Sequence, residues 1–584
     1  MDNPNQLSKI RHTLAHLTAA AVRQLWPGSQ NSIGPAIENG FYQDFEIAGA
    51  ITEKDLPKIE KKIRQLIPQW THFEKKEVSK EEALKEFAWN KYKTELIQEF
   101  AQEGKKLTFH NSPGFIDLCK GGHVEHPNKE IKPDAFKLTH IAGAYWRGNE
   151  KNKMLTRIYG VAFENKEELE KHLAMLAEAE KRDHKILGPK LDLFTFSEKV
   201  GAGLPLWTPK GTLIRDLLDG YVWELRKKIG YQKVEIPHIT KKDLYETSGH
   251  WDKFKDDLFK INTRDGHLFA MKPMNCPHHT QIYARKMWSY RELPQRYSST
   301  TMVYRDEQTG ELSGLARVLS ITQDDAHVFC RFDQVKEELA AIWDKVVEPF
   351  YKSVGFKLKL RLSLRDPMHP ERYLGDASRW LQAEEILRDL AKERKVEFFE
   401  GLGEAAFYGP KLDFLATDSL GRQWQVATIQ LDMVMPERFD LYCVDEKGQH
   451  ERVVMLHAAI MGSIERFMSI LIEHTAGAFP LWLSPAQAIV LPISKKQNVY
   501  ARKVLKELTS AIPDLRIEID DRDESVGKKI REASMQKIPY QVILGEKEMK
   551  SKKITIRTRE GKDLGSMLLK KFAGKIQTEI EKKK

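Results

Sequence analysis

One cysteine and two histidines, far apart along the chain, form a chemically sound set of zinc ligands. They are Cys276 in KPMNCPHH, His327 in TQDDAH and His457 in MLHAAIMGSIERF. Zinc prefers thiolate and imidazole donors, and three protein ligands leave a fourth coordination position open for a small substrate. Taken singly, a buried cysteine or histidine is more often a packing residue. The prediction of a zinc site therefore depends on the sequence around each ligand.

A second group of the same residue types lies near the start of the chain. His12 and His16 are four residues apart in HTLAH, which places both on one face of a helix. Cys119 and His123 have the same spacing around two glycines in CKGGH. From their chemistry, these four residues are a second candidate zinc site. The pattern is not H-E-x-x-H, so a metalloprotease is a poor interpretation.

The segment YRDEQTGELSGLARV suits phosphate binding. We interpret it as a strand, a loop with two glycines and a returning strand. Arg305 ends the first strand, Glu307 follows two residues later, and Arg317 lies on the returning strand. Arginine is always charged and its planar guanidinium matches phosphate oxygens. The alternative is a hairpin with surface ion pairs.

The elements that must position these residues form three predicted domains, at residues 1–185, 186–485 and 486–584. The first mixes amphipathic helices with short strands and ends in a long charged helix at 165–187. In the second, strand-like runs follow one another through mostly short connections, which favours an antiparallel sheet. In the third, strands alternate with helices, as in a small α/β domain. The predicted fold class is therefore multidomain α+β.

Composition narrows the class of protein. A chain of 584 residues exceeds what one core supports. It has no run of about 18 apolar residues for a membrane span, its first residues lack the apolar core of a signal peptide, and four cysteines do not make a disulfide framework. We expect a soluble cytoplasmic protein without a membrane partner. The net charge of +10 suits a polyanion such as RNA, although charge alone does not establish one.

These motifs together resemble a known family. YRDE, the helix GSIERF with Arg466, and the strand GYQKVEIP ending at Pro237 resemble the three signature motifs of class II aminoacyl-tRNA synthetases. KPMNCPHH, TQDDAH, GEAAFYGPKLDF and MLHAAIMGSIERF narrow the resemblance to threonyl-tRNA synthetases, over nearly the whole chain. The resemblance implies an α+β editing domain, a class II catalytic domain built on an antiparallel sheet, an α/β anticodon-binding domain, and a homodimer.

The resemblance also implies a reaction, the ATP-dependent ligation of threonine to tRNA(Thr) through a threonyl-adenylate, with Mg²⁺ accompanying ATP. Zinc on Cys276, His327 and His457 would coordinate the amino group and hydroxyl of threonine. The matching threonine-binding positions are Gln323, Asp325, Tyr408 and Gln430. The matching ATP-binding positions are Arg305, Glu307, Arg317 and Arg466, with Lys411 near the reacting phosphate.

An enzyme that selects threonine in this way also needs a means of removing serine. Serine lacks only one methyl of threonine, which gives a discrimination of only about 10–200-fold. A second, hydrolytic site for mischarged seryl-tRNA(Thr) is therefore expected. The resemblance assigns it to His12, His16, Lys93, Asp117, Cys119 and His123, often working without metal. Because a related editing domain of alanyl-tRNA synthetases binds zinc through this pattern, both alternatives stay open. Glu548 and Arg557 match positions that read the anticodon.

Some features depart from the family, and two other functions compete. Bacterial members usually begin with a small ubiquitin-like module that we do not find here, and Ser299 and Thr301 replace a usual Glu-x-Gly pattern. A non-catalytic RNA-binding regulator on the same scaffold would be expected to lose the zinc ligands or the arginines of the ATP site. A stand-alone hydrolase of mischarged tRNA would not need the second domain. This chain has the zinc ligands, the arginines of the ATP site and the second domain, which argues against both alternatives.

Overall fold

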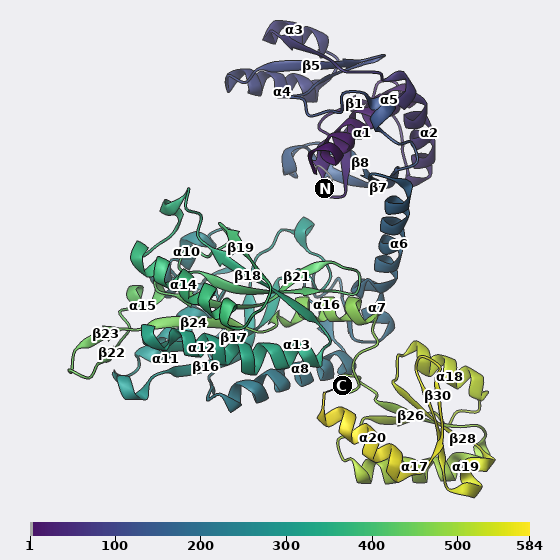
Figure 1. Cartoon of the computed structure of the whole chain (residues 1–584), viewed down its shortest axis with the longest axis vertical. Helices are drawn as coiled ribbons and strands as arrows, with labels where there is room; N and C mark the ends of the chain where they lie inside the picture. Colours follow the sequence, from purple (N-terminus) through teal and green to yellow (C-terminus); the bar gives the residue numbers. More distant parts are fainter. Residues whose placement is uncertain (1–3, 584) are drawn as a thin grey trace. The chain divides into compact units, whose positions relative to one another are not determined.

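The computed structural model describes residues 4–583, and its internal contacts divide the chain into two compact units that adjoin in sequence at Ala177 and Glu178 (Figure 1). No helix in the described part of the chain is both long and apolar enough to cross a membrane.

The first unit is built around helix α1 (Pro4–Leu25), which packs on an antiparallel sheet. The apolar residues Leu14 and Leu17 of α1 meet Phe41, Phe45 and Ile158 of the sheet in one buried core. Helix α2 (Leu56–Leu66) also contributes to this core. The strand order is β1-β3-β8-β7, with β2 beside β3; the strands are β1 (Gln30–Asn31), β2 (Ala36–Ile37), β3 (Gly40–Glu46), β7 (Phe136–Tyr145) and β8 (Met154–Ala162).

A smaller antiparallel sheet completes the first unit. Its order is β4 (Glu74–Val78), β5 (Leu107–Ser112) and β6 (Phe115–Leu118), and helices α3 (Lys80–Glu86) and α4 (Lys91–Gln102) share a second core with it. The Asn90 side chain accepts hydrogen bonds from the backbone N–H groups of Tyr92 and Lys93, as a helix N-cap does. This cap fixes the first turn of α4, which carries Lys93.

The single helix expected at residues 165–187 is wrong, because the chain forms two helices there, α6 (Lys166–Arg182) and α7 (His184–Lys190). Asp183 separates them. Its side chain accepts a hydrogen bond from the backbone N–H of Lys185 and so caps α7. Aspartate is among the preferred N-cap residues, which explains why a new helix begins at this position.

The second unit contains a nine-stranded sheet of order β11-β16-β17-β24-β21-β20-β18-β19, with β25 beside β17. Only the two end pairs are parallel, so the predicted antiparallel sheet is confirmed. The strands are β11 (Gln232–Lys233), β16 (Gln295–Tyr304), β17 (Ser320–Cys330), β18 (Lys357–Leu364), β19 (Phe398–Leu402), β20 (Lys411–Thr417), β21 (Gln423–Asp432), β24 (Val454–Ala459) and β25 (Gly462–Ser463).

Helices cover one face of this sheet, and the candidate zinc-binding and threonine-binding side chains of its strands lie on the other face. On β17, Ala326, Val328 and Cys330 belong to the core that the helices share, whereas Asp325 and His327 alternate with them and face the opposite side. The covering helices are α8 (Pro209–Lys228), α12 (Val335–Ile342), α13 (Glu348–Ser353), α14 (Ala377–Glu393) and α16 (Ile464–Thr475) (Figure 1).

Shorter elements complete the second unit. They are the helices α9 (Lys242–Ser248), α10 (His250–Lys253), α11 (Cys276–Ala284) and α15 (Met435–Arg438), and three small sheets: β9 (Phe194–Thr195) with β10 (Leu206–Trp207); β12 (Ile239–Lys241), β14 (Leu268–Met271) and β13 (Lys260–Asn262); and β15 (Trp288–Ser289), β22 (Tyr442–Val444) and β23 (His450–Arg452).

The C-terminal part of the second unit is the predicted small α/β fold. Strands β27 (Ile517–Ile519), β26 (Ala488–Pro492) and β28 (Tyr540–Leu544) are parallel neighbours, and β29 (Ile554–Thr558) with β30 (Asp563–Met567) forms the predicted hairpin. Its helices are α17 (Asn498–Ala511), α18 (Val526–Met535), α19 (Glu546–Ser551) and α20 (Leu569–Glu581).

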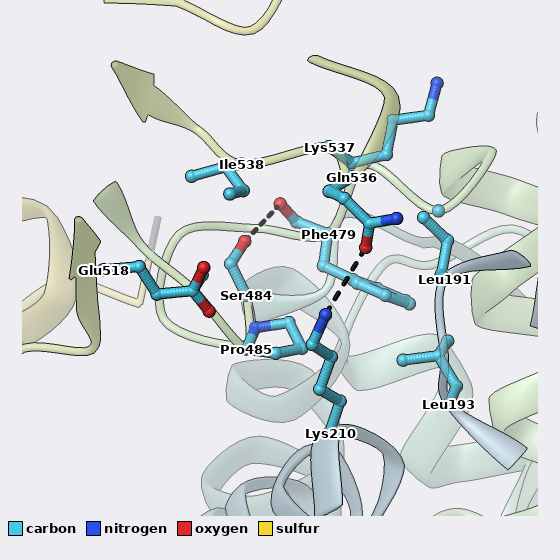
Figure 2. Close-up of a pocket in the computed structure, with 12 residues that line it drawn as sticks. Leu191, Leu193, Lys210, Phe479, Ser484, Pro485, Glu518, Gln536, Lys537 and Ile538 are labelled. Carbon is cyan, nitrogen blue, oxygen red and sulfur yellow. Dashed lines mark hydrogen bonds between the residues drawn. The ribbon is translucent and has the colours of Figure 1, made fainter. Parts of the chain in front are cut away.

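A small cavity lies where this C-terminal part adjoins the rest of the second unit (Figure 2). Lys210 Nζ donates to Gln536 Oε1 at 3.4 Å, and Ser484 Oγ donates to the carbonyl of Phe479 at 3.2 Å. The cavity measures about 40 Å³, which admits a few water molecules, whereas ligand pockets usually measure several hundred Å³. The chemistry is therefore located elsewhere.

Candidate active site and editing site

The register of the large sheet brings the predicted zinc ligands together. His327 on β17 is directly opposite His457 on β24, and cross-strand partners point to the same face of a sheet. Cys276 is the first residue of α11. The ligand atoms of these three residues all lie within 4.8 Å of one another, and His327 Nε2 is 3.0 Å from His457 Nδ1.

Two further residues orient the imidazoles. The second ring nitrogen of His327, Nδ1, is 2.7 Å from His279 Nδ1, and that of His457, Nε2, is 3.1 Å from Asp432 Oδ2. The remaining nitrogens of His327 and His457 are therefore free to bind a metal. A carboxylate partner such as Asp432 on the outer nitrogen is usual for histidines that bind zinc. The donors and their neighbours fit a zinc ion.

Sequence analysis missed these two orienting residues, although their spacing carries a signal. His279 follows Cys276 by three residues, which is one turn of a helix, and Asp432 follows Gln430 by two, which is the same face of a strand. His279 in turn lies 3.1 Å from Ser299 Oγ. The serine that departs from the family pattern thus takes part in orienting the histidines.

Burial sets the protonation of the candidate ligands. It lowers the pKa of His327 well below its usual value, so the imidazole is neutral and able to bind metal. It raises the pKa of the Cys276 thiol, and the nearby carboxylates of Asp325 and Asp432 raise that pKa further. A zinc ion would reverse this by favouring the thiolate.

The predicted threonine-binding residues surround the same point. Burial raises the pKa of Asp325 to about 6, and its carboxylate accepts a hydrogen bond of 3.2 Å from Asn275 Nδ2. The same Asn275 nitrogen lies 3.4 Å from Gln323 Oε1. Across the site, the Tyr408 hydroxyl donates to Gln430 Oε1 at 3.2 Å. All four predicted residues therefore lie near the zinc ligands in a hydrogen-bonded arrangement.

Arg305 follows the last residue of β16, as predicted for a group that binds phosphate. Its guanidinium is largely buried, and burial lowers its pKa. Its Nη2 is 3.4 Å from Met274 Sδ, whereas its buried Nε has no hydrogen-bond partner among the described residues. A buried charged donor left without a protein partner is unusual and points to an anionic ligand.

The other predicted ATP contacts differ in their surroundings. Arg317 is not on a returning strand, as we expected, but in a turn before β17 that is closed on Ser313, where it binds Glu307. Arg466 is exposed in the first turn of α16. Lys411 begins β20, with Nζ 3.2 Å from Asp413.

A cavity of about 350 Å³ adjoins these groups and is large enough for a small substrate. Met274, which contacts Arg305, and Tyr408 of the threonine-binding group both line it. His250 lines it as well, and its Nε2 is 3.9 Å from Cys276 Sγ. His250 is a further candidate that sequence analysis missed, because it lies in a separate short helix.

The predicted editing residues also converge, within the first unit. His12 and His16 of α1 and the loop residues Cys119 and His123 have ligand atoms within 4.8 Å of one another. His12 Nε2 is 3.5 Å from Cys119 Sγ and 3.3 Å from His16 Nε2. Gly121, with φ of +104°, allows the tight loop, and a side chain there would press on His110.

Buried ion pairs hold the residues of the cluster in place. Asp117 is 2.6 Å from Lys93 Nζ and 3.1 Å from His16 Nδ1. Burial lowers the pKa of His16, but hydrogen bonds with Asp117 and Cys119 outweigh it and raise the pKa to about 9. Burial raises the pKa of Cys119, but hydrogen bonds from His12, His123 and His16 outweigh it and lower the pKa to about 2. The cluster thus holds a thiolate beside a protonated imidazole.

One editing candidate was missed. His110 on β5 is opposite Asp117 on β6, is 5% exposed, and has its ring centre 4.9 Å from that of His123. The hairpin pattern FHNSPGFID would have placed it on the same face as Asp117.

The predicted anticodon residues lie in the C-terminal part. Glu548 on α19 accepts hydrogen bonds from the Gly545 backbone and the Thr555 hydroxyl, at 2.9 Å each. Arg557 on β29 has a buried Nε without a hydrogen-bond partner in the described part of the chain.

Comparisons with known families agree with this geometry. A model of the tRNA synthetase class II core domain (G, H, P, S and T) matches residues 259–475, and a model of the anticodon binding domain matches 487–579. A third model, the threonyl and alanyl tRNA synthetase second additional domain, matches 109–159. The predicted fold class is confirmed, and a class II core implies the use of ATP and Mg²⁺.

Individual relatives narrow the family further. The threonine–tRNA ligase of Cytophaga hutchinsonii is 48% identical over 581 residues, covering 98% of this chain and 89% of the relative. That of Thermotoga petrophila is 44% identical over 588 residues, covering 100% of this chain and 90% of the relative. A crystal structure described as the RNA binding domain of threonyl-tRNA synthetase from Cryptosporidium parvum has a TM-score of 0.63 and 35% identity, over 68% of this chain and 98% of that one. The chain belongs to the threonyl-tRNA synthetase family.

Proposed function

We propose that this protein ligates threonine to tRNA(Thr) through a threonyl-adenylate and hydrolyses mischarged seryl-tRNA(Thr). The observation that carries the proposal is the convergence of Cys276, His327 and His457 beside Arg305, whose buried Nε has no hydrogen-bond partner among the described residues. The family and the editing-domain match support the same reaction. The class II core implies that the reaction uses ATP and Mg²⁺.

Threonine is proposed to be selected at the set of zinc ligands. Zinc held by Cys276, His327 and His457 would supply a Lewis-acidic position for an amino group and a neighbouring hydroxyl. Asp325 would accept the hydrogen bond of the hydroxyl, and its partner Asn275 fixes the carboxylate for this role. Valine has no hydroxyl, and a polar site of this kind rejects such an analogue by roughly 10⁴-fold or more.

Activation is proposed to occur at the adjoining arginines. A carboxylate oxygen of threonine forms a bond to the α-phosphorus of ATP, and the bond from that phosphorus to the pyrophosphate oxygen breaks. Arg305 would stabilise the charge on the α-phosphate, because it is buried and positioned before the substrate arrives. Arg317 and Arg466 would bind the outer phosphates, Lys411 would approach the reacting phosphate, and Glu307 would contact the adenine edge.

Editing is proposed to use the first unit without metal. A water molecule would attack the ester carbonyl of seryl-tRNA, the ester bond would break, and serine and tRNA would leave. His123 and the Cys119 thiolate would orient that water, His12 would take its proton, and Lys93 with Asp117 would fix His16. A zinc-bound editing site is the second candidate, because the four ligand atoms lie close enough to share one ion.

The proposal also covers the domain boundaries, the oligomeric state, the location in the cell and the contacts with tRNA. The domain boundaries at 185 and 485, the homodimer and the cytoplasmic location stay predictions. Glu548 and Arg557 are proposed to contact unstacked anticodon bases, since sequence-specific RNA recognition targets such loops. The basic net charge of +10 supports binding of the tRNA backbone.

The proposal is tested by ATP–pyrophosphate exchange with threonine, serine or valine, paired with elemental analysis of the purified protein. We expect exchange with threonine, weaker exchange with serine, almost none with valine, and one zinc ion per chain. Absence of threonine-dependent exchange would favour the regulator or stand-alone hydrolase instead. Exchange that persisted after complete removal of zinc would contradict the role of the zinc ligands.

A further inference from the structure

A buried histidine outside both sites joins three separate segments of the second unit. His184, the first residue of α7, is 4% exposed. Its Nδ1 is 2.6 Å from Glu473 Oε1, in the last turn of α16. Its Nε2 accepts a hydrogen bond of 3.1 Å from the backbone N–H of Leu315, in loop 305–319. That loop carries Arg305, Glu307 and Arg317.

The two hydrogen bonds fix the state of the ring. A backbone N–H can only donate, so Nε2 carries no proton and Nδ1–H donates to Glu473. Burial raises the pKa of Glu473, but hydrogen bonds from His184 and Arg422 outweigh it, so the pKa is lowered and the carboxylate is charged. Asp183, His184 and Glu473 have potential metal-binding atoms near one another, but both nitrogens of His184 are already used.

The loop is shaped to rest on this histidine. The backbone N–H of Ser313 donates to the carbonyl of Arg317 at 3.1 Å, which closes a short turn. Leu315 is at the middle of that turn, and its side chain is completely buried in the main core. Gly314 has φ of +51°, and a side chain there would collide with His184 Nε2. The turn that carries Arg317 is therefore held at its centre by the buried Leu315 side chain and by the hydrogen bond that the Leu315 backbone N–H donates to His184 Nε2.

We propose that His184 is a positioning residue for ATP, acting through Leu315 on the turn that carries Arg317. Through Glu473 it also holds the last turn of α16, the helix whose first turn carries Arg466. His184 itself contacts no substrate. The inference rests on the proposed activation reaction, and it assigns a role in that reaction to a residue from the helix that precedes the catalytic sheet in sequence.

Two substitutions separate the functions of the two ring nitrogens. The amide nitrogen of asparagine can replace Nδ1, so His184→Asn keeps the bond to Glu473 and loses the bond to Leu315. The amide oxygen of glutamine can reach the place of Nε2, so His184→Gln keeps the bond to Leu315. We expect His184→Asn to raise the KM for ATP by about tenfold, the size of one buried hydrogen bond left unmade, with little change in the KM for threonine. His184→Gln should recover most of this loss.

The experiment is threonine-dependent ATP–pyrophosphate exchange on the full chain, with each substrate varied in turn. An ATP KM that stayed normal in His184→Asn, or rose together with the threonine KM, would overturn the inference, as would a glutamine variant no better than the asparagine variant. If His184→Asn does not fold, Gly314→Ala keeps His184 but pushes the turn away from it, and the same ATP-specific rise is expected; a normal ATP KM there would also refute the inference. Wild-type protein without exchange would instead refute the proposed function.

Discussion

Arg317 and Glu307, which we propose to contact different parts of ATP, bind each other in this structure. Arg317 donates from Nε at 2.8 Å and from Nη2 at 2.5 Å to the same oxygen of Glu307. Nη2 also donates to Glu311 at 2.9 Å. Because the Arg317 side chain is 47% exposed, the ion pair is worth only about 0–1 kcal/mol. A phosphate contact, which is a charge-assisted hydrogen bond, is worth about 1.5–3 kcal/mol and would displace it.

Arg317→Ala is therefore expected to raise the KM for ATP by about 10- to 100-fold and to leave the KM for threonine nearly unchanged. ATP–pyrophosphate exchange with ATP varied at saturating threonine measures the effect. Glu311→Gln is the matched control, because it removes a charge from the same ion-pair group without removing a proposed ATP contact. An unchanged ATP KM in Arg317→Ala would show that this loop does not bind the triphosphate.

Cys276→Ala is expected to remove bound zinc and threonine activation together, because it deletes one of the three proposed protein ligands. Cys443→Ala is the control, since Cys443 is also fully buried but belongs to β22, outside the ligand set. Elemental analysis and amino-acid-dependent exchange report the two losses. Asp432→Asn should weaken zinc binding by about 10- to 100-fold by releasing His457. Full activation in metal-depleted Cys276→Ala would exclude the zinc role.

The parts of the site that sequence analysis found were those with a local chemical pattern. Cys276, His327 and His457 each stand in a distinctive segment, and HTLAH and CKGGH show a four-residue spacing that any helix or tight loop brings together. Alternating and short-connected strands indicated the antiparallel sheet. These features could be predicted because each depends on a few neighbouring residues.

The parts that were missed depend on contacts between distant segments. His184 reaches Leu315 and Glu473 only after the chain has folded, and no spacing in the sequence links the three. The returning strand expected to carry Arg317 begins only at Ser320, because the preceding residues form the turn that rests on His184. The strand expected in GYQKVEIP, ending at Pro237, shortens to the two residues Gln232–Lys233. Tertiary contacts decided these elements against their local β propensity.

Cys119→Ala is expected to leave threonine charging intact and to let seryl-tRNA(Thr) accumulate, because the thiolate belongs to the first unit only. Deacylation of preformed seryl-tRNA measures the loss directly. His140→Ala is the control, since this exposed histidine lies on β7 outside the cluster. A chelator tests for zinc in the editing site. If a chelator abolishes deacylation by the wild type while zinc stays bound to Cys276, His327 and His457, the result would favour a zinc-bound editing site. Unimpaired deacylation in Cys119→Ala would exclude the thiolate.

Lys272 gives the stability of the second unit a predictable dependence on pH. The lysine is completely buried, and Nζ donates to Thr301 Oγ1 at 3.0 Å. Burial lowers its pKa to about 8, with Asp325 opposing the change. Below pH 8 the lysine is charged in both the folded and unfolded states, and burying that charge costs free energy. Between pH 8 and its unfolded pKa of about 10.4, only the unfolded chain keeps the proton, so the free energy of unfolding rises with pH.

Lys272→Met has no such proton to lose. The free energy of unfolding of the wild type, measured by urea titration, should therefore rise relative to this variant between pH 7 and pH 10, by up to about 3 kcal/mol. The exposed residue Lys255 provides the control Lys255→Met, whose difference from the wild type should stay constant over the same range. Parallel curves for the wild type and Lys272→Met would show that Lys272 keeps its proton in the folded protein. In that case Asp325, which favours the charged lysine, would dominate over burial at this position.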